Sequence, residues 1–387
     1  MTRAVYDVVI IGAGSIGVPS AMYLAEKGAK VLCLDQFPSA GQGSNKCALG
    51  GIRATHSTPA KIKLCLEGLN VFSSWKENYG DDIEWRRGGY VFVAYRSAEE
   101  ELLKKTLVVQ KQAGLNIDWK DRDDFLKICP GIRENGLIGG TFSPEDGFAS
   151  PMLSCIGFQK RAVELGADFH FNERVISIMR CKDKVIGVRT DKGEYVTNCV
   201  INAAGPWARE VVKAACISGD VQVVPDSHEG SITEPVKDFL GPMVVDIRSV
   251  PGSANFYFYQ NNLGQVIACY TPSPAIVGFD RRETSSYLPM ISSRMVNLMP
   301  KLGNLKMRRT WRGLYAMTPD GSPLVGRSPE LDGYIDAIGM CGQGYMLGPG
   351  IGALVSRIAT NQLLETDIPI LEELSPSRTF TGVEALK

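Results

Sequence analysis

The hydrophobic pattern at the start of the chain predicts a strand, a helix and a second strand. Residues 6–12 contain the uninterrupted apolar run Val8-Val-Ile-Ile11, which is typical of a parallel strand that is covered on both faces. A helical segment over 20–27 and a strand over 30–35 follow. This order predicts a βαβ unit, the repeating element of parallel sheets.

Three further helices are predicted before the middle of the chain. Apolar residues at three-and-four spacing indicate helices over 61–79 and 99–113, with a strand over 90–95 between them. A third helix begins at Pro151, because Ser150 is a good N-cap and proline is favoured at the first helical position. It ends at Gly166, a residue that commonly follows a helix.

The second half of the chain is richer in strands. Tight turns at 182–184 and 191–193 separate expected strands over 169–171, 175–180, 185–190 and 195–202. Residues 255–259 and 265–270 predict a hairpin. A last strand over 333–339, a glycine-rich turn and a helix over 345–364 complete the pattern.

Length, charge and cysteine content narrow the class of protein. The 387 residues allow two large domains, and the balance of 42 basic and 42 acidic residues disfavours nucleic acid and anionic lipid as partners. No segment approaches the roughly 18 apolar residues of an integral membrane segment, and the first residues lack a secretory signal, so a cytoplasmic location is expected. Ten cysteines without a C-x-x-C pair and three histidines predict reduced thiols and no metal site.

The turn after the first strand predicts a dinucleotide site. Gly12-Ala-Gly14-Ser-Ile-Gly17 gives a tight turn at Gly12, close approach of a pyrophosphate at Gly14 and close helix–strand packing at Gly17. Asp35 ends the next strand, where an acid binds a ribose diol and repels the extra phosphate of NADP. The spacing alone leaves FAD and NAD open.

Other motifs resolve that choice through a resemblance to a known family. They are Gly43-Ser-Asn-Lys-Cys-Ala-Leu-Gly-Gly-Ile-Arg53, Ser143-Pro-Glu-Asp-Gly147, Asn202-Ala-Ala-Gly-Pro-Trp207, Thr233-Glu-Pro235, Trp311-Arg-Gly-Leu-Tyr-Ala-Met-Thr-Pro-Asp320 and Gly339-Met-Cys-Gly-Gln-Gly-Tyr-Met346. Together with the first βαβ unit they resemble the D-amino-acid-oxidase-like FAD family, which contains sarcosine oxidase, glycine oxidase and the proline dehydrogenases. The branch that they resemble most is the catalytic β subunit of dye-linked L-proline dehydrogenase complexes.

The resemblance implies a fold and a division into domains. It implies an α/β, doubly wound, Rossmann-like FAD-binding domain of the glutathione-reductase-like type, formed by residues 1–88, 145–215 and 308–387. Residues 89–144 and 216–307 would form an inserted, β-rich α+β substrate domain.

The same resemblance implies which residues contact FAD. Lys46 would offset charge on the reduced flavin, although a solvated loop lysine is the alternative. The positions of the cysteine and histidine that bind flavin covalently in relatives carry Gly313 and Asn45 or Lys46, so non-covalent FAD is expected, with Cys47 the nearest exception. The expected cofactor residues are Gly12, Ala13, Gly14, Ser15, Ile16, Gly17, Asp35, Gln36, Ser44, Lys46, Gly50, Gly51, Val175, Ala204, Gly205, Trp207, Gly313, Gly342, Gln343, Gly344, Tyr345 and Met346.

The substrate site is implied in the same way. Arg53 matches the arginine that holds a substrate carboxylate, since a guanidinium grips a carboxylate through two bonds, with a structural ion pair as the alternative. Tyr315 replaces the carboxylate-binding arginine of glycine oxidase relatives, and its hydroxyl is still able to bond the carboxylate. Tyr257 and Tyr259 share one face of a strand and are candidate pocket residues, with plain sheet packing as the alternative. His56 either lines the pocket or is structural.

These features predict an enzyme that oxidises the CH–NH bond of a small secondary or N-methyl amino acid, with proline favoured over sarcosine. Strands 255–259 and 265–270 carry no lysine of the kind that activates oxygen in the oxidase relative, so a non-oxygen acceptor and a hetero-oligomer with electron-accepting subunits are expected. The alternatives are a glycine or sarcosine oxidase that produces hydrogen peroxide, and a non-catalytic FAD-bearing subunit.

Overall fold

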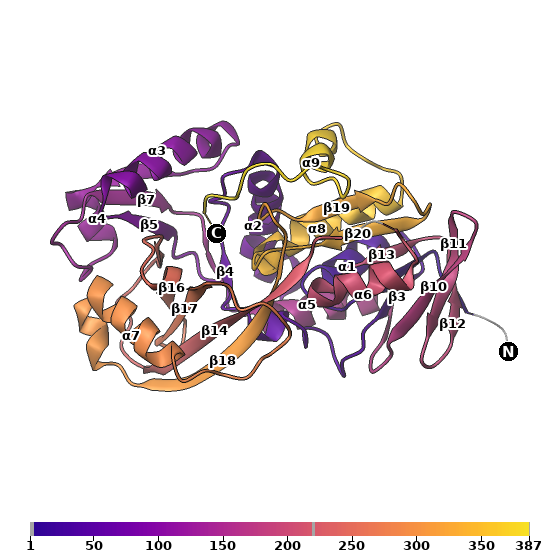
Figure 1. Cartoon of the computed structure of the whole chain (residues 1–387), viewed down its shortest axis with the longest axis horizontal. Coiled ribbons are helices and arrows are strands. Elements are labelled where there is room, and N and C mark those ends of the chain that lie inside the picture. The colour runs from indigo at the N-terminus through magenta and orange to yellow at the C-terminus, as the bar shows by residue number, and fades with distance from the viewer. Residues whose placement is uncertain (1–3, 219–220, 387) are drawn as a thin grey trace.

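The computed structural model describes residues 4–218 and 221–386, and it contains a central six-stranded sheet (Figure 1). The strand order is β19 (Leu324–Arg327), β20 (Tyr334–Ile338), β13 (Val200–Asn202), β2 (Val8–Ile11), β3 (Val31–Leu34) and β9 (Asp168–His170). Every neighbouring pair is parallel except β19 and β20. The parallel pair β2–β3, joined by α1 (Gly17–Glu26), confirms the predicted βαβ unit.

Both faces of this sheet are covered, as the apolar run in β2 predicts. Val8 and Ile10 belong to a core that includes α1, α2 (Pro59–Tyr79), α5 (Pro151–Glu164) and α8 (Gly344–Ala359). Val9 and Ile11 join a core on the other face with α6 (Ala208–Ala214) and a four-stranded sheet. The order of that sheet is β1 (Ala4–Val5), β12 (Glu194–Val196), β11 (Lys184–Thr190) and β10 (Val175–Cys181).

A second large sheet of eight strands lies beside the first (Figure 1). Its order is β18 (Met307–Met317), β14 (Val224–Pro235), β17 (Gln265–Ser273), β16 (Gly252–Gln260), β15 (Met243–Asp246), β5 (Tyr90–Ala94), β7 (Gly139–Ser143) and β6 (Asp118–Asp121). One face packs on α4 (Arg122–Ile128) and α7 (Tyr287–Leu298), while the opposite face carries the aromatic rings of Tyr90, Phe92 and Tyr259. The sheet includes β18, which the expected division assigns to the other domain.

The remaining elements are short or peripheral. β4 (Gly51–Ile52) pairs with β8 (Gly147–Phe148), α3 (Ser97–Gln112) packs near β5 and β7, and α9 (Asp367–Glu373) contacts α2. Three short 3-10 helices span Asn45–Cys47, Gly205–Trp207 and Pro300–Asn304.

Local sequence signals explain both ends of α5. The Ser150 side chain accepts a hydrogen bond from the backbone N–H of Leu153 at the start of α5, and Gly166 has a positive φ of 95° after its end, as predicted. The hairpin β16–β17 is also confirmed. Two predictions were wrong: α8 ends at Ala359 rather than 364, and residues 195–202 form two strands in different sheets.

The break in residues 195–202 has a local cause. The Thr197 hydroxyl accepts a hydrogen bond from the backbone N–H of Cys199, at 3.2 Å, in the turn between β12 and β13. A side-chain bond of this kind offers the backbone an alternative to the sheet ladder.

Three global features bear on function. Across residues 4–218 and 221–386, no helix has the length and apolarity needed to cross a membrane. The described part of the chain also contains no group of three or more His, Cys, Asp or Glu side chains that could hold a metal ion. The ten cysteines all lie within the described residues and form no disulfide with one another.

Candidate active site

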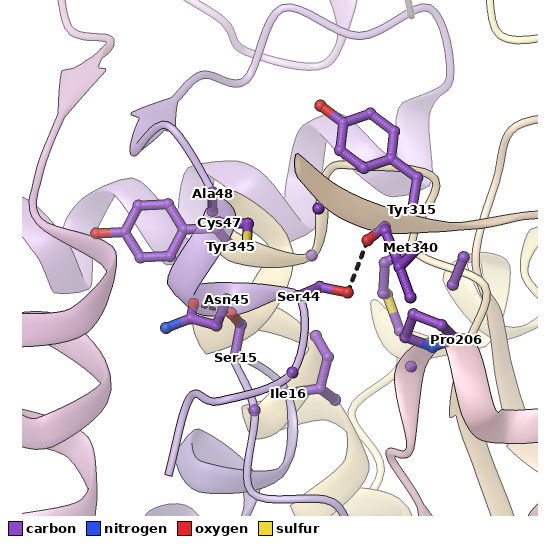
Figure 2. Close-up of a pocket in the computed structure, with 18 of the residues that line it drawn as sticks. Ser15, Ile16, Ser44, Asn45, Cys47, Ala48, Pro206, Tyr315, Met340 and Tyr345 are labelled. Atoms are coloured by element: carbon purple, nitrogen blue, oxygen red, sulfur yellow. Dashed lines mark hydrogen bonds between the residues drawn. The ribbon is translucent and has the colours of Figure 1, made fainter. Parts of the chain in front are cut away.

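A cavity of about 490 Å³ lies between the two large sheets (Figure 2). Its wall combines the turn after β2, the loop 43–51, the segment after β13, part of β18 and the turn before α8. The structure therefore brings together most of the expected cofactor residues. Those that line the cavity are Gly12, Gly14, Ser15, Ile16, Asp35, Gln36, Ser44, Gly50, Gly51, Val175, Ala204, Gly205, Trp207, Gly313, Gly342, Gln343, Gly344, Tyr345 and Met346.

The glycine turn after β2 has the geometry that its sequence predicts. Gly12 has a φ of 108°, and a Cβ atom there would lie 2.5 Å from the carbonyl oxygen of Ala203. A Cβ atom at Gly17 would collide with the carbonyl of Gly12, so the start of α1 packs against the turn. At Gly14 a Cβ atom would meet nothing within 4 Å. The backbone is therefore open to the cavity where a pyrophosphate would approach.

Asp35 holds this turn in place. Its carboxylate accepts hydrogen bonds from the backbone N–H groups of Ala13, at 2.7 Å, and Phe37, at 2.8 Å. Burial raises the pKa of Asp35, and these two bonds oppose the shift. Binding of a ribose diol by Asp35 stays a prediction.

The turn before α8 contains polar atoms that lack a partner. Both the Nε2 and the Oε1 atoms of the Gln343 amide are buried without a hydrogen bond in the described structure. Gln343 lines the cavity directly before Gly344, where α8 begins. Since buried amides are normally satisfied, these atoms fit a polar ligand in the cavity. The open backbone at Gly14 and this amide suit an elongated dinucleotide such as FAD.

Three of the expected cofactor residues do not line the cavity. Ala13 and Gly17 support the turn from behind, through the contacts described above. Lys46 is exposed, and its Nζ atom lies 3.5 Å from the Gln42 side chain. Lys46 therefore matches the alternative interpretation, a solvated loop lysine. The expectation that Lys46 lies beside the flavin is wrong.

Cys47 lines the cavity next to Gly313. A Cβ atom at Gly313 would lie 2.6 Å from the Cβ atom of Cys47, so glycine is required there for the loop to approach β18. Burial raises the pKa of the Cys47 thiol. A neutral thiol is a poor nucleophile. Non-covalent binding of FAD stays a prediction.

Arg53 is a buried cation at the wall of the cavity. Its guanidinium donates hydrogen bonds to the backbone carbonyls of Thr55 and, at 2.5 Å, of Leu386, and it lies over the ring of Phe92. Within the described residues it forms no ion pair with a carboxylate, so the structural ion pair considered for Arg53 is wrong. The charge of Arg53 acts on the buried Asp146 and opposes the rise in the pKa of that carboxyl, but no carboxylate bonds to the guanidinium within the described residues. The N–H groups of a buried guanidinium suit a carboxylate ligand.

His56 and Tyr259 lie outside the cavity, although both were candidate catalytic residues. The His56 ring is fully buried between Arg53 and Cys65, with its Nε2 atom 3.3 Å from the Cys65 Sγ atom. Burial, together with the charges of Arg53 and Lys61, holds the pKa of His56 well below its usual range. Tyr259 donates to the carbonyl of Leu49 and packs on Phe148.

Tyr257 and Tyr315 do line the cavity, and their hydroxyl oxygens lie 3.1 Å apart. Burial raises the pKa of both phenols, so both are neutral hydrogen-bond donors. The ring of His228 stacks on Tyr315 with 3.8 Å between ring centroids.

His228 is a cavity residue that the sequence analysis missed. Its Nε2 atom lies 3.2 Å from the Asp226 carboxylate, and its Nδ1 atom is buried without a partner in the described structure. Burial alone would raise the pKa of Asp226, but the hydrogen bond and charge of His228 hold it below its ordinary value. The period-two spacing of Asp226 and His228 on a strand was the only available signal.

Comparison with known proteins identifies the family. The profile of the family described as "DAO: FAD dependent oxidoreductase" matches residues 7–358. The chain belongs to this family of FAD-dependent oxidoreductases. The expected FAD fold, with a Rossmann-like part and a β-rich part, and the expected FAD cofactor are confirmed.

Individual relatives in the FAD-dependent oxidoreductase family have different activities. The crystal structure of L-proline dehydrogenase from P. horikoshii has a TM-score of 0.90 and 28% identity, covering 97% of this chain and 98% of that one. The 4-methylaminobutanoate oxidase (formaldehyde-forming) of Paenarthrobacter nicotinovorans is 26% identical. The match covers 89% of this chain but only 42% of the length of that relative. The glycine oxidase of Bacillus subtilis (strain 168) is 24% identical over 94% of this chain and 95% of its own.

Proposed function

We propose that this FAD-dependent oxidoreductase oxidises the CH–NH bond of a small secondary amino acid, with proline as the first candidate and sarcosine as the second. The observation that carries the proposal is the buried Arg53 guanidinium, which borders the cavity without a carboxylate partner in the described chain. The substrate carboxylate would supply the directly bonded anion that Arg53 lacks. The likeness to an L-proline dehydrogenase over 97% of the chain supports the choice of proline.

Binding by Arg53 orients the substrate as well as retaining it. A planar guanidinium bonds a carboxylate at two points, and this fixes the direction of the attached carbon. Tyr257 and Tyr315 offer neutral hydroxyl donors in the same cavity. The glycine turn and Gln343 would hold FAD, which would supply the acceptor for the hydride that leaves the carbon beside the nitrogen.

We infer that His228 takes the proton from the substrate amine. A protonated nitrogen has no electron pair to form the imine, so this proton must leave before the C–H bond breaks. When the imidazole is neutral and its Nε2 donates to Asp226, Nδ1 carries a lone pair and is able to accept a proton. That atom has no partner in the described structure.

We propose that the reduced flavin passes its electrons to an acceptor other than oxygen, such as a partner subunit. Strands β16 and β17 carry no lysine of the kind that the family resemblance associates with oxygen activation. The rival activity, a glycine or sarcosine oxidase, predicts hydrogen peroxide without an added dye.

The test is anaerobic reduction of the purified protein by a panel of proline, hydroxyproline, sarcosine, dimethylglycine and glycine. Proline should bleach the flavin absorbance fastest, and Arg53→Ala should lower kcat/KM for proline by about 100-fold, the value of a lost charge-assisted pair. Pyrrolidine, which lacks the carboxylate, serves as the control and should be equally poor with both proteins. A flavin that none of these compounds reduces would refute the proposal and favour a non-catalytic subunit.

A further inference from the structure

Arg53 has a partner that lies more than 300 residues away in the sequence. One terminal nitrogen of its guanidinium donates to the carbonyl of Leu386, which belongs to residues 375–386, here called the strap. The strap runs from the end of α9 toward β4, between the two large sheets, where the end of the chain is marked (Figure 1). The residue assigned to the substrate is therefore held by a remote segment.

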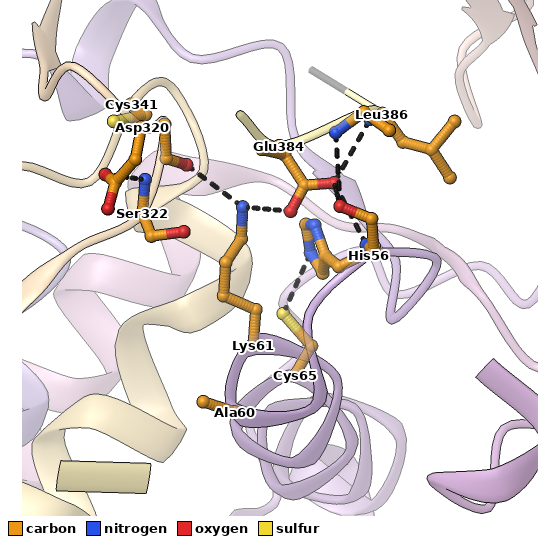
Figure 3. Close-up of polar contacts among 12 residues, drawn as sticks. His56, Ala60, Lys61, Cys65, Asp320, Ser322, Cys341, Glu384 and Leu386 are labelled. Carbon is orange, nitrogen blue, oxygen red and sulfur yellow. Dashed lines mark hydrogen bonds and ion pairs between the residues drawn. The ribbon is translucent and has the colours of Figure 1, made fainter. Parts of the chain in front are cut away.

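A buried ion pair anchors the strap (Figure 3). The Lys61 Nζ atom on α2 lies 2.7 Å from the Glu384 carboxylate, and both side chains have no exposed surface. The other carboxylate oxygen of Glu384 accepts from the backbone N–H and the hydroxyl of Ser57. The backbone N–H of Glu384 donates to the carbonyl of Asp320. These bonds fix the backbone directly before Leu386.

The charges of this pair depend on each other. Burial lowers the pKa of Lys61, and the neighbouring Glu384 opposes the shift. Burial would raise the pKa of Glu384, but Lys61 outweighs it and the pKa is lowered. Separation of a buried pair leaves each charge buried without a partner, which costs free energy. The pair therefore holds the strap in one position.

The Leu386 side chain docks behind the substrate wall. It is 1% exposed and belongs to the apolar cluster of Tyr90 and Phe92, and the ring of Phe92 lies 5.4 Å from the Arg53 guanidinium. Tyr90, Phe92 and Arg53 line the cavity, whereas Leu386 does not. The strap thus bonds to Arg53 through a residue that does not itself line the cavity.

We propose that the strap is a positioning element for substrate binding, in which the docked Leu386 fixes the direction of the Arg53 guanidinium. The Leu386 carbonyl holds one terminal nitrogen and the Thr55 carbonyl holds the other. Because backbone carbonyls hold both terminal nitrogens, the remaining N–H groups of the guanidinium are available to a carboxylate in the cavity. This inference rests on the proposed function of Arg53.

The test measures binding of a carboxylate rather than turnover. Pyrrole-2-carboxylate, a planar analogue of proline, is titrated into the FAD-loaded protein, and Kd is read from the flavin absorbance. Leu386→Asp, which undocks the strap, should raise Kd roughly tenfold, the value of a misaligned charge-assisted bond. Leu386→Met preserves the apolar volume and should bind normally. Val383→Asp adds the same charge at a side chain that is 65% exposed and should also bind normally.

Two further variants separate the possible failures. Leu386→Ala decides the question if Leu386→Asp does not fold or load FAD. In an Arg53→Ala background, Leu386→Asp should cause no additional loss. The strap inference is overturned if Leu386→Asp and Leu386→Ala bind normally, or if Leu386→Asp weakens binding equally with and without Arg53. If Arg53→Ala itself binds normally, the proposed function fails instead.

Discussion

At the residue scale, the cavity wall is unusual because three polar groups lack ordinary partners. Arg53 forms no ion pair with a carboxylate among the described residues. The Gln343 amide and the Nδ1 atom of His228 are buried without a hydrogen bond within those residues. Folded proteins satisfy most buried polar groups, and exceptions gather at functional sites. We interpret the three groups as contacts for cofactor and substrate.

The role of His228 gives a prediction about pH. In wild type, the rate with proline should rise between pH 6 and pH 10, since the amine must lose its proton. In His228→Asn, kcat/KM at pH 7 should fall by about 100-fold, within the range of general-base catalysis, and the rise should move to higher pH. Stopped-flow reduction of the flavin at several pH values measures this. A variant profile that superimposes on that of wild type would remove His228 from the proposal, while an unchanged flavin spectrum controls for folding.

At the element scale, prediction from sequence succeeded where the signal is local. The βαβ unit, the N-cap of α5 and the β16–β17 hairpin each depend on residues within one segment. The break between β12 and β13 was missed because the residue whose side-chain bond interrupts the ladder, Thr197, is of a type that is common within strands. The cofactor residues came from the family resemblance. His228 escaped because no local motif marks a pocket whose walls are distant in sequence.

The packing of α1 against the turn predicts different effects for two glycines. Gly14→Ala places a methyl group in the open space of the cavity, so it should weaken FAD binding without changing the stability of the apoprotein. Gly17→Ala drives a methyl group into the Gly12 carbonyl, so it should also destabilise the apoprotein by about 1–3 kcal/mol, as overpacking does. FAD titration and urea unfolding of the apoproteins measure the two effects. Equal apoprotein stabilities would contradict this packing.

At the scale of the whole molecule, the site exists only where the two large sheets meet. The loop 43–53 and the turn before α8 form one wall, and β16 and β18 form another. The strap bonds to Arg53 through the Leu386 carbonyl. Because these segments lie far apart along the chain, the geometry of the site depends on the stability of the whole fold.

That stability should depend on pH through Asp336 in β20. Burial raises the pKa of this carboxyl to about 7, against the opposing hydrogen bonds of Asn202 and Tyr334. The folded protein therefore keeps a proton that the unfolded chain releases near pH 4, so rising pH favours unfolding between about pH 4 and 7.

Asp336→Asn removes this titration and keeps the shape of the side chain. Its free energy of unfolding relative to wild type should increase with pH up to about 7 and then level off, by on the order of a few kcal/mol. Urea unfolding at pH 5, 6, 7 and 8 with saturating FAD measures the difference. Asp332→Asn, at an exposed carboxylate shortly before β20, is the matched control. Its free energy of unfolding should change with pH in the same way as that of wild type. If Asp336→Asn also runs parallel, the carboxyl is ionised in the folded protein throughout this range, and the core of the six-stranded sheet tolerates its charge.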